Sequence, residues 1–331
     1  MPVVEWSDTG QRLNAPAGAP LLAALEAAGL SLPSQCRSGT CGRCRVRLLE
    51  GAVDYPFDPP ALTPQDQAQG LILCCLARPL GDLRLARLDA AAPSALREFP
   101  VRVQAREWLA PEVLRLSLRL PRGEPFLYRP GQYIEVLGPD GSPRWFSVAN
   151  APDGEQLELH LRVTAQSRFA RWAAEQMPLK QILRVRGPLG RFHLQEPLDR
   201  PLLLLAGGTG YAPIQALLQQ LAQRPPAQPV TLFRGVRAAG DLYADAYPRQ
   251  LAAAGWLRYV PVLSAPAADW EGARGWVHEA LLAEYPQLAP YTVYAAGPPA
   301  MLAAARAPFE AAGLAPERFI TDSFEDAPRS S

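Results

Sequence analysis

The sequence predicts three small domains of different fold class: a cysteine-rich N-terminal domain, an antiparallel β-domain and a C-terminal α/β domain with a parallel sheet. Three observations predict this division. All five cysteines lie between Cys36 and Cys75, short alternating strands fill the middle of the chain, and apolar runs separated by helical stretches fill the last third. At roughly 100 to 200 residues per domain, 331 residues leave room for two or three domains. We expect domains at 1–88, 101–197 and 198–331, with a linker at 89–100.

The composition is that of an ordinary globular protein and argues against several classes of function. Hydrophobic residues make up 48% and charged residues 20%, and the formal net charge of +1 provides no basic field for nucleic acid. No apolar run approaches the roughly 18 residues that a membrane-spanning helix requires, and residues 1–15 contain no stretch that resembles a signal peptide. We therefore expect a cytoplasmic protein that binds neither nucleic acid nor a membrane.

Two helices are expected in the N-terminal domain. Pro20 begins the first helix and Gly29 ends it, and its apolar residues share one face: Leu21, Leu22, Leu25 and Ala28. Thr63, which is followed by a proline and an early acidic residue, should cap a second, short helix. Residues 89–100 contain small residues and two prolines without any alternation, which is typical of a linker.

The rest of the chain shows two different sequence patterns, one after the other. Strand-like alternation at 101–105 and 157–163, interrupted by proline and glycine, predicts an antiparallel barrel or sandwich. Beyond Pro201 the apolar runs alternate with helical stretches such as 214–221, which predicts a parallel α/β sheet. These apolar runs are 202–206, 230–233, 259–263 and 292–295.

The spacing of the cysteines indicates a metal site. Three lie close together and two follow about thirty residues later: Cys36, Cys41 and Cys44, then Cys74 and Cys75. Three close thiolates and one distant one are the plant-type 2Fe-2S arrangement, and Gly39 and Gly42 allow the loop to curl around a cluster. A structural zinc site is the alternative, but it usually needs a second closely spaced pair, which is missing here. Spacing alone leaves the choice between Cys74 and Cys75 open.

Residues 1–88 resemble a plant-type ferredoxin, and this resemblance implies a β-grasp fold. The family motif after the fourth ligand is Cys-x-Ala-x-Pro, and residues 75–79 read Cys-Leu-Ala-Arg-Pro. In that register Cys74 is a buried neighbour. The resemblance therefore implies a 2Fe-2S cluster held by Cys36, Cys41, Cys44 and Cys75.

Residues 130–133 (Pro-Gly-Gln-Tyr) and 144–150 (Arg-Trp-Phe-Ser-Val-Ala-Asn) resemble the flavin-binding barrel of the ferredoxin-NADP reductase superfamily, whose signature is Arg-x-(Tyr/Phe)-Ser. The resemblance implies that an arginine fork binds a flavin phosphate, that the aromatic residue packs on the isoalloxazine and that the serine reaches a ring nitrogen or carbonyl. Alternation places the arginine and the aromatic residue on the same side of the strand. A further strand lines the flavin in this superfamily. The candidate residues are Arg144, Phe146, Ser147, His160, Leu161 and Arg162.

One turn departs from the superfamily pattern. Relatives bind the flavin pyrophosphate with a Gly-Gly-x-x-(Ser/Thr) turn at a helix N-terminus, whereas residues 166–170 here read Gln-Ser-Arg-Phe-Ala. Backbone N–H groups can still hold the phosphates, with help from Arg168. The departure leaves FMN open as an alternative, but an N-terminal ferredoxin resembles the FAD-using branch, so we expect FAD.

Residues 201–213 form an apolar strand, a glycine-rich turn and the start of a helix, the order that phosphate binding needs. The Gly-Gly-Thr-Gly-x-Ala-Pro sequence resembles the superfamily's cofactor loop, and residues 294–301 resemble its loop beside the nicotinamide. Ala296 occupies a position where relatives commonly have cysteine, from which we expect slower or looser positioning rather than inactivity. The candidate residues are Gly207, Gly208, Thr209, Gly210, Pro213, Gly297 and Pro298.

Two further features concern the adenosine end of the nicotinamide cofactor and the aromatic residue that packs against the flavin. Arg234 and Arg237 lie in a stretch that resembles the superfamily's adenosine-binding segment and could hold a 2′-phosphate, but relatives that use NADH share this pattern. We expect NADH, with NADPH as the alternative. Relatives place an aromatic residue near the C-terminus against the flavin, and Phe324 is the candidate, although a core or surface phenylalanine is an equal alternative.

The resemblance as a whole implies a ferredoxin-fused reductase, similar to the reductase components of multicomponent oxygenases and to the CDP-6-deoxy-glucoseen reductase-like group. Hydride would pass from NADH to FAD, and single electrons would pass through the cluster to an acceptor protein such as an oxygenase or a deoxysugar dehydratase. No catalytic side chain is expected, because the cofactors supply the chemistry. A non-catalytic electron-transfer module and a free flavin reductase are the competing hypotheses.

A basic patch beside the cluster is the one hint about the acceptor. Four arginines surround the close cysteines: Arg37, Arg43, Arg45 and Arg47. They could suit an acidic partner, although a solvated arginine face is the more common explanation.

Overall fold

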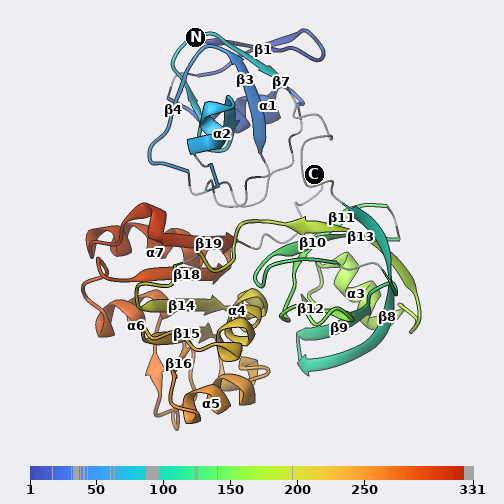
Figure 1. The fold of residues 1–331 in the computed structure, drawn as a ribbon, viewed down its shortest axis with the longest axis vertical. Coiled ribbons are helices and arrows are strands. Elements are labelled where there is room, and N and C mark those ends of the chain that lie inside the picture. The colour runs from blue at the N-terminus through green and yellow to red at the C-terminus, as the bar shows by residue number, and fades with distance from the viewer. Residues whose placement is uncertain are drawn as a thin grey trace. The chain divides into compact units, whose positions relative to one another are not determined.

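The computed structural model divides the chain into two compact units, Met1–Ala95 and Leu96–Ser331 (Figure 1). It describes every residue except 17, 31, 33–36, 38, 40, 41, 43, 60, 63, 87–96, 124, 125, 140, 196 and 324–331. Among the described residues we find no helix with both the length and the apolar character needed to span a bilayer.

The first unit has the predicted ferredoxin-type fold, built on one five-stranded sheet with the order β2-β1-β7-β3-β5. Strand β1 pairs antiparallel with β2 and parallel with β7, and a separate two-stranded ladder joins β4 to β6. The strands are β1 Val3–Trp6, β2 Gln11–Asn14, β3 Arg45–Glu50, β4 Val53–Asp54, β5 Leu71–Leu73, β6 Arg78–Pro79 and β7 Leu83–Ala86. The helices are α1 Leu21–Ala27 and α2 Pro64–Ala68.

Helix α1 buries the apolar face that the sequence predicts. Leu21, Leu22 and Leu25 are buried in the same core cluster as residues of β1 and β7. Gly29, just beyond the helix, has φ +75°, the left-handed conformation that commonly follows a helix C-terminus. The second predicted helix is also present as α2, although Thr63 lies outside the described residues.

The second unit begins with an antiparallel barrel, as predicted. Its six strands have the order β11-β10-β13-β8-β9-β12, and a bridge between Val148 and Leu159 links the two end strands and closes the sheet. Strand β8 includes residues 97–100, which the sequence assigned to the linker. The elements are β8 Arg97–Ala110, β9 Val113–Arg119, β10 Tyr133–Leu137, β11 Pro143–Ser147, β12 Gln156–Arg162, α3 Arg168–Glu175 and β13 Ile182–Leu189.

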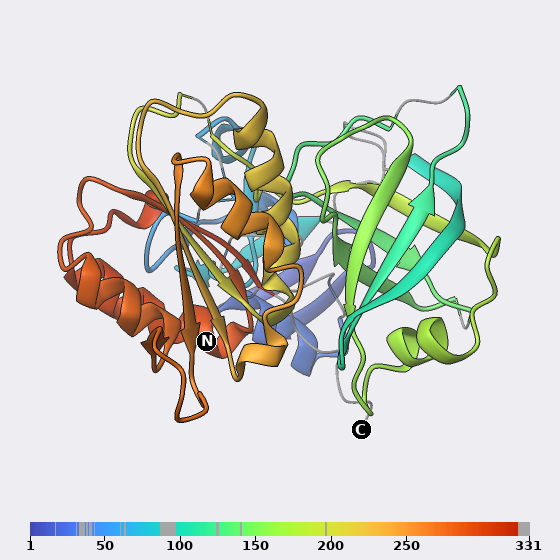
Figure 2. The same cartoon turned by 90° about the horizontal axis from the view of Figure 1, so that it is seen from below.

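The α/β domain follows, with a six-stranded parallel sheet in the order β17-β16-β15-β14-β18-β19. The strands are β14 Leu202–Gly207, β15 Val230–Val236, β16 Leu257–Leu263, β17 Ala273–Arg274, β18 Thr292–Gly297 and β19 Phe319–Ser323. Helices α4 and α5 pack on one face of the sheet, and α6 and α7 on the other (Figure 2). The helices are α4 Tyr211–Gln223, α5 Ala246–Ala253, α6 Val277–Glu284 and α7 Pro299–Ala311.

The strand order places a ligand crevice at a defined position. The chain leaves β14 toward β15 and β16, then returns to the other side of β14 as β18 and β19. In open α/β sheets, ligands bind at the carboxyl ends of the strands where the order reverses in this way. Here that position is the carboxyl end of β14 and β18, where both predicted glycine loops lie.

Candidate cofactor sites

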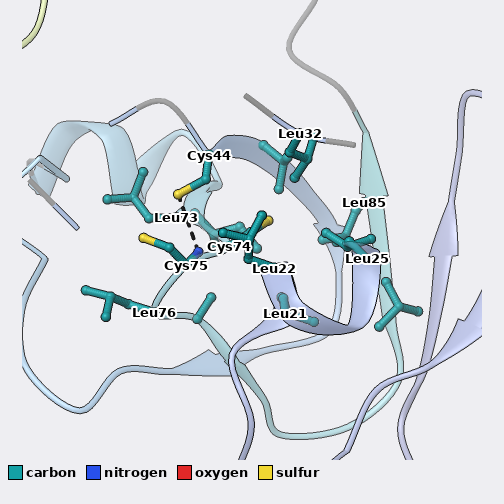
Figure 3. Close-up of a cluster of buried hydrophobic side chains, with 14 of the residues drawn as sticks. Leu21, Leu22, Leu25, Leu32, Cys44, Leu73, Cys74, Cys75, Leu76 and Leu85 are labelled. Atoms are coloured by element: carbon teal, nitrogen blue, oxygen red, sulfur yellow. Dashed lines mark hydrogen bonds between the residues drawn. The ribbon is translucent and has the colours of Figure 1, made fainter. Parts of the chain in front are cut away.

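Cys44 and Cys75 lie together in the core of the first unit. The backbone N–H of Cys75 donates to Sγ of Cys44 at 3.3 Å, and Figure 3 shows the two sulfur atoms on the same side of the chain. Gly39 and Gly42 have φ of +76° and +70°, a region that favours glycine and lets the loop curl tightly. Two sulfurs on one side of the chain, an N–H donor and two glycines with left-handed φ fit a 2Fe-2S cluster.

The neighbouring cysteine points elsewhere. Cys74 is 0% exposed, and Figure 3 shows its sulfur on the side of the α1 leucines, away from the sulfur of Cys75. Its backbone N–H donates to the carbonyl of Cys44 at 3.0 Å. This orientation favours Cys75 over Cys74 as a ligand. Cys36 and Cys41 lie outside the described residues.

Arg144 and Phe146 share the face of β11 that α3 covers. The ring centroid of Phe146 lies 5.4 Å from that of Phe169 in α3. Arg144 lines a cavity of about 290 Å³ together with Arg168 and Arg171 of the same helix. Guanidinium groups around a cavity are a donor set for phosphate, so Arg144 and Arg168 fit the diphosphate of a flavin dinucleotide.

Ser147 points to the other side of β11, into the contact with the α/β domain. Its hydroxyl donates to Oδ2 of Asp322 in β19 at 2.9 Å, and both side chains are buried. Asp322 pairs in register with Ala296 of β18, one residue before Gly297. The carboxylate therefore joins the predicted flavin strand to the predicted nicotinamide loop. Phe324, two residues later, lies outside the described residues.

His160 also lies at this contact. Its Nε2 is 2.8 Å from Oε1 of Glu158, and its Nδ1 is 3.2 Å from the hydroxyl of Tyr243 in the α/β domain. The carboxylate of Glu158 accepts a further hydrogen bond from Gln215 of α4 at 3.2 Å. The side chain of His160 therefore connects the two domains.

The other two residues of the predicted flavin strand lie on different faces of β12. Leu161 is fully buried in the barrel core, whereas Arg162 is exposed and 3.4 Å from Glu112. A flavin beside this strand would contact its backbone rather than these side chains. The assignment of both residues to the flavin stays a prediction.

The His160 contact predicts a dependence of stability on pH. Burial lowers the pKa of His160 below 6.5, and it outweighs the carboxylate of Glu158, which raises that pKa; the cations Arg234 and Arg115 lower it further. Below about pH 6.5 the unfolded imidazole takes up a proton that the folded one does not. We therefore expect the urea midpoint to fall as the pH drops from 7.5 to 5.5.

His160→Gln tests the assignment, because it removes this titrating group. The variant should flatten the decline of the urea midpoint with falling pH. An unchanged slope in His160→Gln would assign the pH dependence to other groups.

The two predicted nicotinamide loops meet at the carboxyl ends of β14 and β18. A Cβ on Gly210 would lie 2.1 Å from the carbonyl oxygen of Ala296, and one on Gly297 would lie 3.1 Å from Cα of Gly207. Gly208 has φ +54° and no atom within 4 Å of a Cβ position, so the surface of the loop is open there. The remaining candidates adjoin these loops: Thr209 before α4, Pro213 in its first turn and Pro298 before α7.

The open loop at the start of α4 fits a pyrophosphate. Helix α4 is 13 residues long and begins directly after the glycine turn, so its N-terminal dipole and N–H groups face the loop. Close packing between glycines holds the two loops together at the carboxyl ends of β14 and β18. This is the donor set that a nicotinamide dinucleotide requires.

The two arginines that were candidates for a 2′-phosphate differ in exposure: Arg234 is buried and Arg237 is exposed. Arg234 is 0% exposed, and its guanidinium lies 3.8 Å from the ring centroid of Tyr211 and 4.7 Å from that of Tyr243. The expectation that it could reach a cofactor phosphate is therefore wrong for Arg234. Arg237 is exposed, with its Nε 4.0 Å from Oδ2 of Asp241.

Sequence reasoning missed the residues that join the two domains. Asp322, Glu158, Gln215 and Tyr243 become neighbours of the predicted site residues only through contacts between distant segments. Asp322 alone carried a local signal. It lies in a strand, Phe-Ile-Thr-Asp-Ser, whose polar residues are all buried, and a run of polar residues at the end of a buried strand commonly marks a site.

Family models match all three parts of the chain. A 2Fe-2S iron-sulfur cluster binding domain matches residues 4–80, an oxidoreductase FAD-binding domain matches 100–194, and an oxidoreductase NAD-binding domain matches 204–307. These matches confirm the predicted cofactors: a 2Fe-2S cluster, FAD and a nicotinamide dinucleotide.

Relatives that align over most of this chain are named as reductases. CDP-6-deoxy-L-threo-D-glycero-4-hexulose-3-dehydrase reductase from Yersinia pestis is 35% identical over 87% of this chain and 88% of its own. The reductase subunit of an aromatic O-demethylase from Amycolatopsis is 33% identical over 96% of this chain and 97% of its own. The crystal structure of an Amycolatopsis cytochrome P450 reductase matches with a TM-score of 0.69 and 31% identity, over 98% of this chain and 99% of its own. The chain therefore belongs to the ferredoxin-fused, FAD- and NAD-binding oxidoreductases of the ferredoxin-NADP reductase superfamily.

Proposed function

We propose that this reductase draws on NADH and delivers single electrons to the terminal component of an oxygenase. A bound flavin accepts two electrons and releases them one at a time, and a plant-type cluster passes one per step at a low potential. The observation that carries the proposal is the Ser147–Asp322 hydrogen bond of 2.9 Å. It ties β11, which we assign to the flavin, to β19 beside the predicted nicotinamide loop, and so supports the alignment that hydride transfer needs.

Two of the relatives support different acceptors. A Comamonas relative that aligns with 96% of this chain is named as a reductase component of terephthalate 1,2-dioxygenase, which supports an oxygenase. A hexulose dehydrase is the second candidate, because the Yersinia pestis reductase is 35% identical.

Anaerobic addition of NADH, followed by mixing with purified acceptors, tests the proposal. NADH should bleach both the flavin and the cluster bands of the visible spectrum, and an oxygenase terminal component encoded beside this gene should reoxidise the cluster. Reoxidation by a sugar dehydrase alone would select the second candidate. A spectrum that NADH does not change would reject the reductase itself.

The arginines near the cluster provide weak support for an acidic partner. Arg37 lies 3.1 Å from Glu26, Arg45 lies 3.5 Å from Asp66, and Arg47 donates to the carbonyl of Gln69 at 2.8 Å. Their charge is therefore partly neutralised or directed into the domain. Arg43 lies outside the described residues.

The segment after β15 supports NADH over NADPH. With Arg234 buried, Arg237 is the remaining candidate of the two for a 2′-phosphate, and Asp241 adds a negative charge next to it. The carboxylate of Asp241 also accepts from the backbone N–H of Ala238 at 3.0 Å, so it is held in this position. A 2′-phosphate near this carboxylate would be repelled.

Asp241→Asn should narrow the preference for NADH. The amide oxygen can keep the hydrogen bond to Ala238 while the negative charge is lost, so kcat/KM for NADPH should rise roughly fivefold relative to NADH, about 1 kcal/mol. Steady-state reduction of ferricyanide with both cofactors measures the ratio. A parent enzyme that prefers NADPH would contradict the assignment.

A further inference from the structure

The cavity beside α3 has a size and a lining that bear on which flavin the barrel binds. It has a volume of about 290 Å³ and is lined by residues of β11, α3 and the segments next to them: Pro139, Arg144, Arg168, Phe169, Arg171, Trp172, Glu175 and Gln176. This volume is at the lower end of the roughly 300–1,000 Å³ of small-molecule sites. The cavity therefore suits one part of a dinucleotide rather than the whole.

The arginines that line it are not equivalent. Nε of Arg171 lies 3.4 Å from Oε1 of Glu175, so its charge is partly neutralised. Nη1 of Arg144 donates to the carbonyl of Pro143 at 2.8 Å, a neutral partner. The guanidinium of Arg168 makes no ion pair or hydrogen bond to the described residues. Among the described residues, the guanidinium groups of Arg144 and Arg168 have no carboxylate partner, and both line one cavity. This arrangement indicates an anion carrying more than one negative charge.

The local backbone explains why a side chain is needed here. The turn before α3 contains no glycine at residues 164–168. The hydroxyl of Ser167 is already hydrogen-bonded within this turn. The Ser167 hydroxyl accepts from the N–H of Thr164 at 2.6 Å and lies 2.9 Å from the carbonyl of the same residue. The serine is therefore occupied within its own turn, and Arg168 is the first residue of α3.

The aromatic residues complete the cavity. Trp172 lies one turn beyond Arg168 on α3, where residues at i and i+4 share a face, and its ring centroid is 5.7 Å from that of Phe169. A flat, partly exposed indole beside two arginines suits a purine base attached to a diphosphate.

We propose that Arg168, together with Arg144, binds the diphosphate of FAD, and that the cavity beside Trp172 receives the AMP half, so that Arg168 selects FAD over FMN. This inference rests on the assignment of a flavin to the barrel. FMN ends at one phosphate, which Arg144 alone can bind. Only FAD extends far enough to use Arg168.

Flavin binding to the full-length apoprotein tests the proposal without measuring turnover. Dissociation constants for FAD and FMN are obtained from the quenching of flavin fluorescence, for the parent and for Arg168→Ala. We expect the substitution to weaken FAD at least about 10-fold, as for the loss of one charge-assisted hydrogen-bond donor, and to weaken FMN less than about 3-fold. Arg168→Lys should restore part of the lost FAD affinity. Because Arg168 is exposed, the apoprotein should unfold at the same urea concentration.

Arg171→Ala is the matched control, since it removes a charge from the same helix that is already paired. It should change the ratio of the two dissociation constants less than Arg168→Ala does. An unchanged ratio in Arg168→Ala, or an equal loss for both flavins, would overturn the role of Arg168 while leaving the reductase assignment intact. A parent apoprotein that binds neither flavin would overturn both.

Discussion

Replacing Cys44 or Cys75 with serine is expected to abolish electron transfer to cytochrome c, while NADH still bleaches the flavin. Sγ of Cys44 accepts the backbone N–H of Cys75 at 3.3 Å, so the two residues form one side of the predicted cluster site. A 2Fe-2S cluster needs four protein ligands, usually thiolates. Losing one of them should release the iron, and cytochrome c reduction should fall to the background rate. The absorbance of the cluster and the rate of cytochrome c reduction measure the two effects.

Cys74→Ala is the control that separates the two adjacent cysteines. Cys74 is 0% exposed within the apolar core, so its loss should cost some stability but leave the iron content and the cytochrome c rate unchanged. If Cys74→Ala loses the cluster and Cys75→Ser keeps it, the fourth ligand has been assigned to the wrong residue. If both serine variants keep full cytochrome c activity, the flavin itself reduces the acceptor and the free flavin reductase hypothesis gains support.

The fold could be predicted from the sequence because each domain has a strong local pattern. The alternation in β12 and the apolar run of β14 identify an antiparallel and a parallel sheet from a few residues each. The cysteine spacing and the glycine turn at Gly207–Gly210 identify cofactors for the same reason, since the chemistry requires these residue types at fixed separations.

Contacts between segments that are distant in the sequence could not be predicted in this way. Arg234 belongs to a pattern that suggests an exposed, cofactor-facing arginine, but β15 directs its side chain into the face covered by Tyr211 and Tyr243. His160 lies in a strand that resembles a flavin-lining strand, but its side chain contacts Tyr243 instead. These outcomes depend on which side of a strand a distant segment covers, information that no single segment contains.

Asp322→Ala is expected to slow reduction of the flavin by NADH by about two orders of magnitude, the cost of a misplacement of roughly 1 Å in a reacting pair. The carboxylate of Asp322 accepts the hydroxyl of Ser147 at 2.9 Å and lies in register with Ala296. Its removal would leave the hydroxyl of Ser147, which is only 4% exposed, without this acceptor. The predicted flavin strand β11 would then lose a link to β19, which pairs with β18 next to the predicted nicotinamide loop. Stopped-flow bleaching of the flavin at several NADH concentrations gives the limiting rate and the dissociation constant separately.

The separation between rate and affinity decides whether Asp322 positions the reacting groups. A positioning residue should lower the limiting rate while the dissociation constant for NADH changes little, because the open loop at Gly208 that we assign to the pyrophosphate is untouched. Asp322→Asn keeps an acceptor for Ser147 and should recover much of the rate. Thr321→Val changes the preceding buried residue, whose hydroxyl has no partner among the described residues, and should leave the rate unchanged. If Asp322→Ala lowers NADH affinity and the limiting rate by equal factors, or if Thr321→Val is as slow, then Asp322 supports the packing of β19 and does not align the reacting groups.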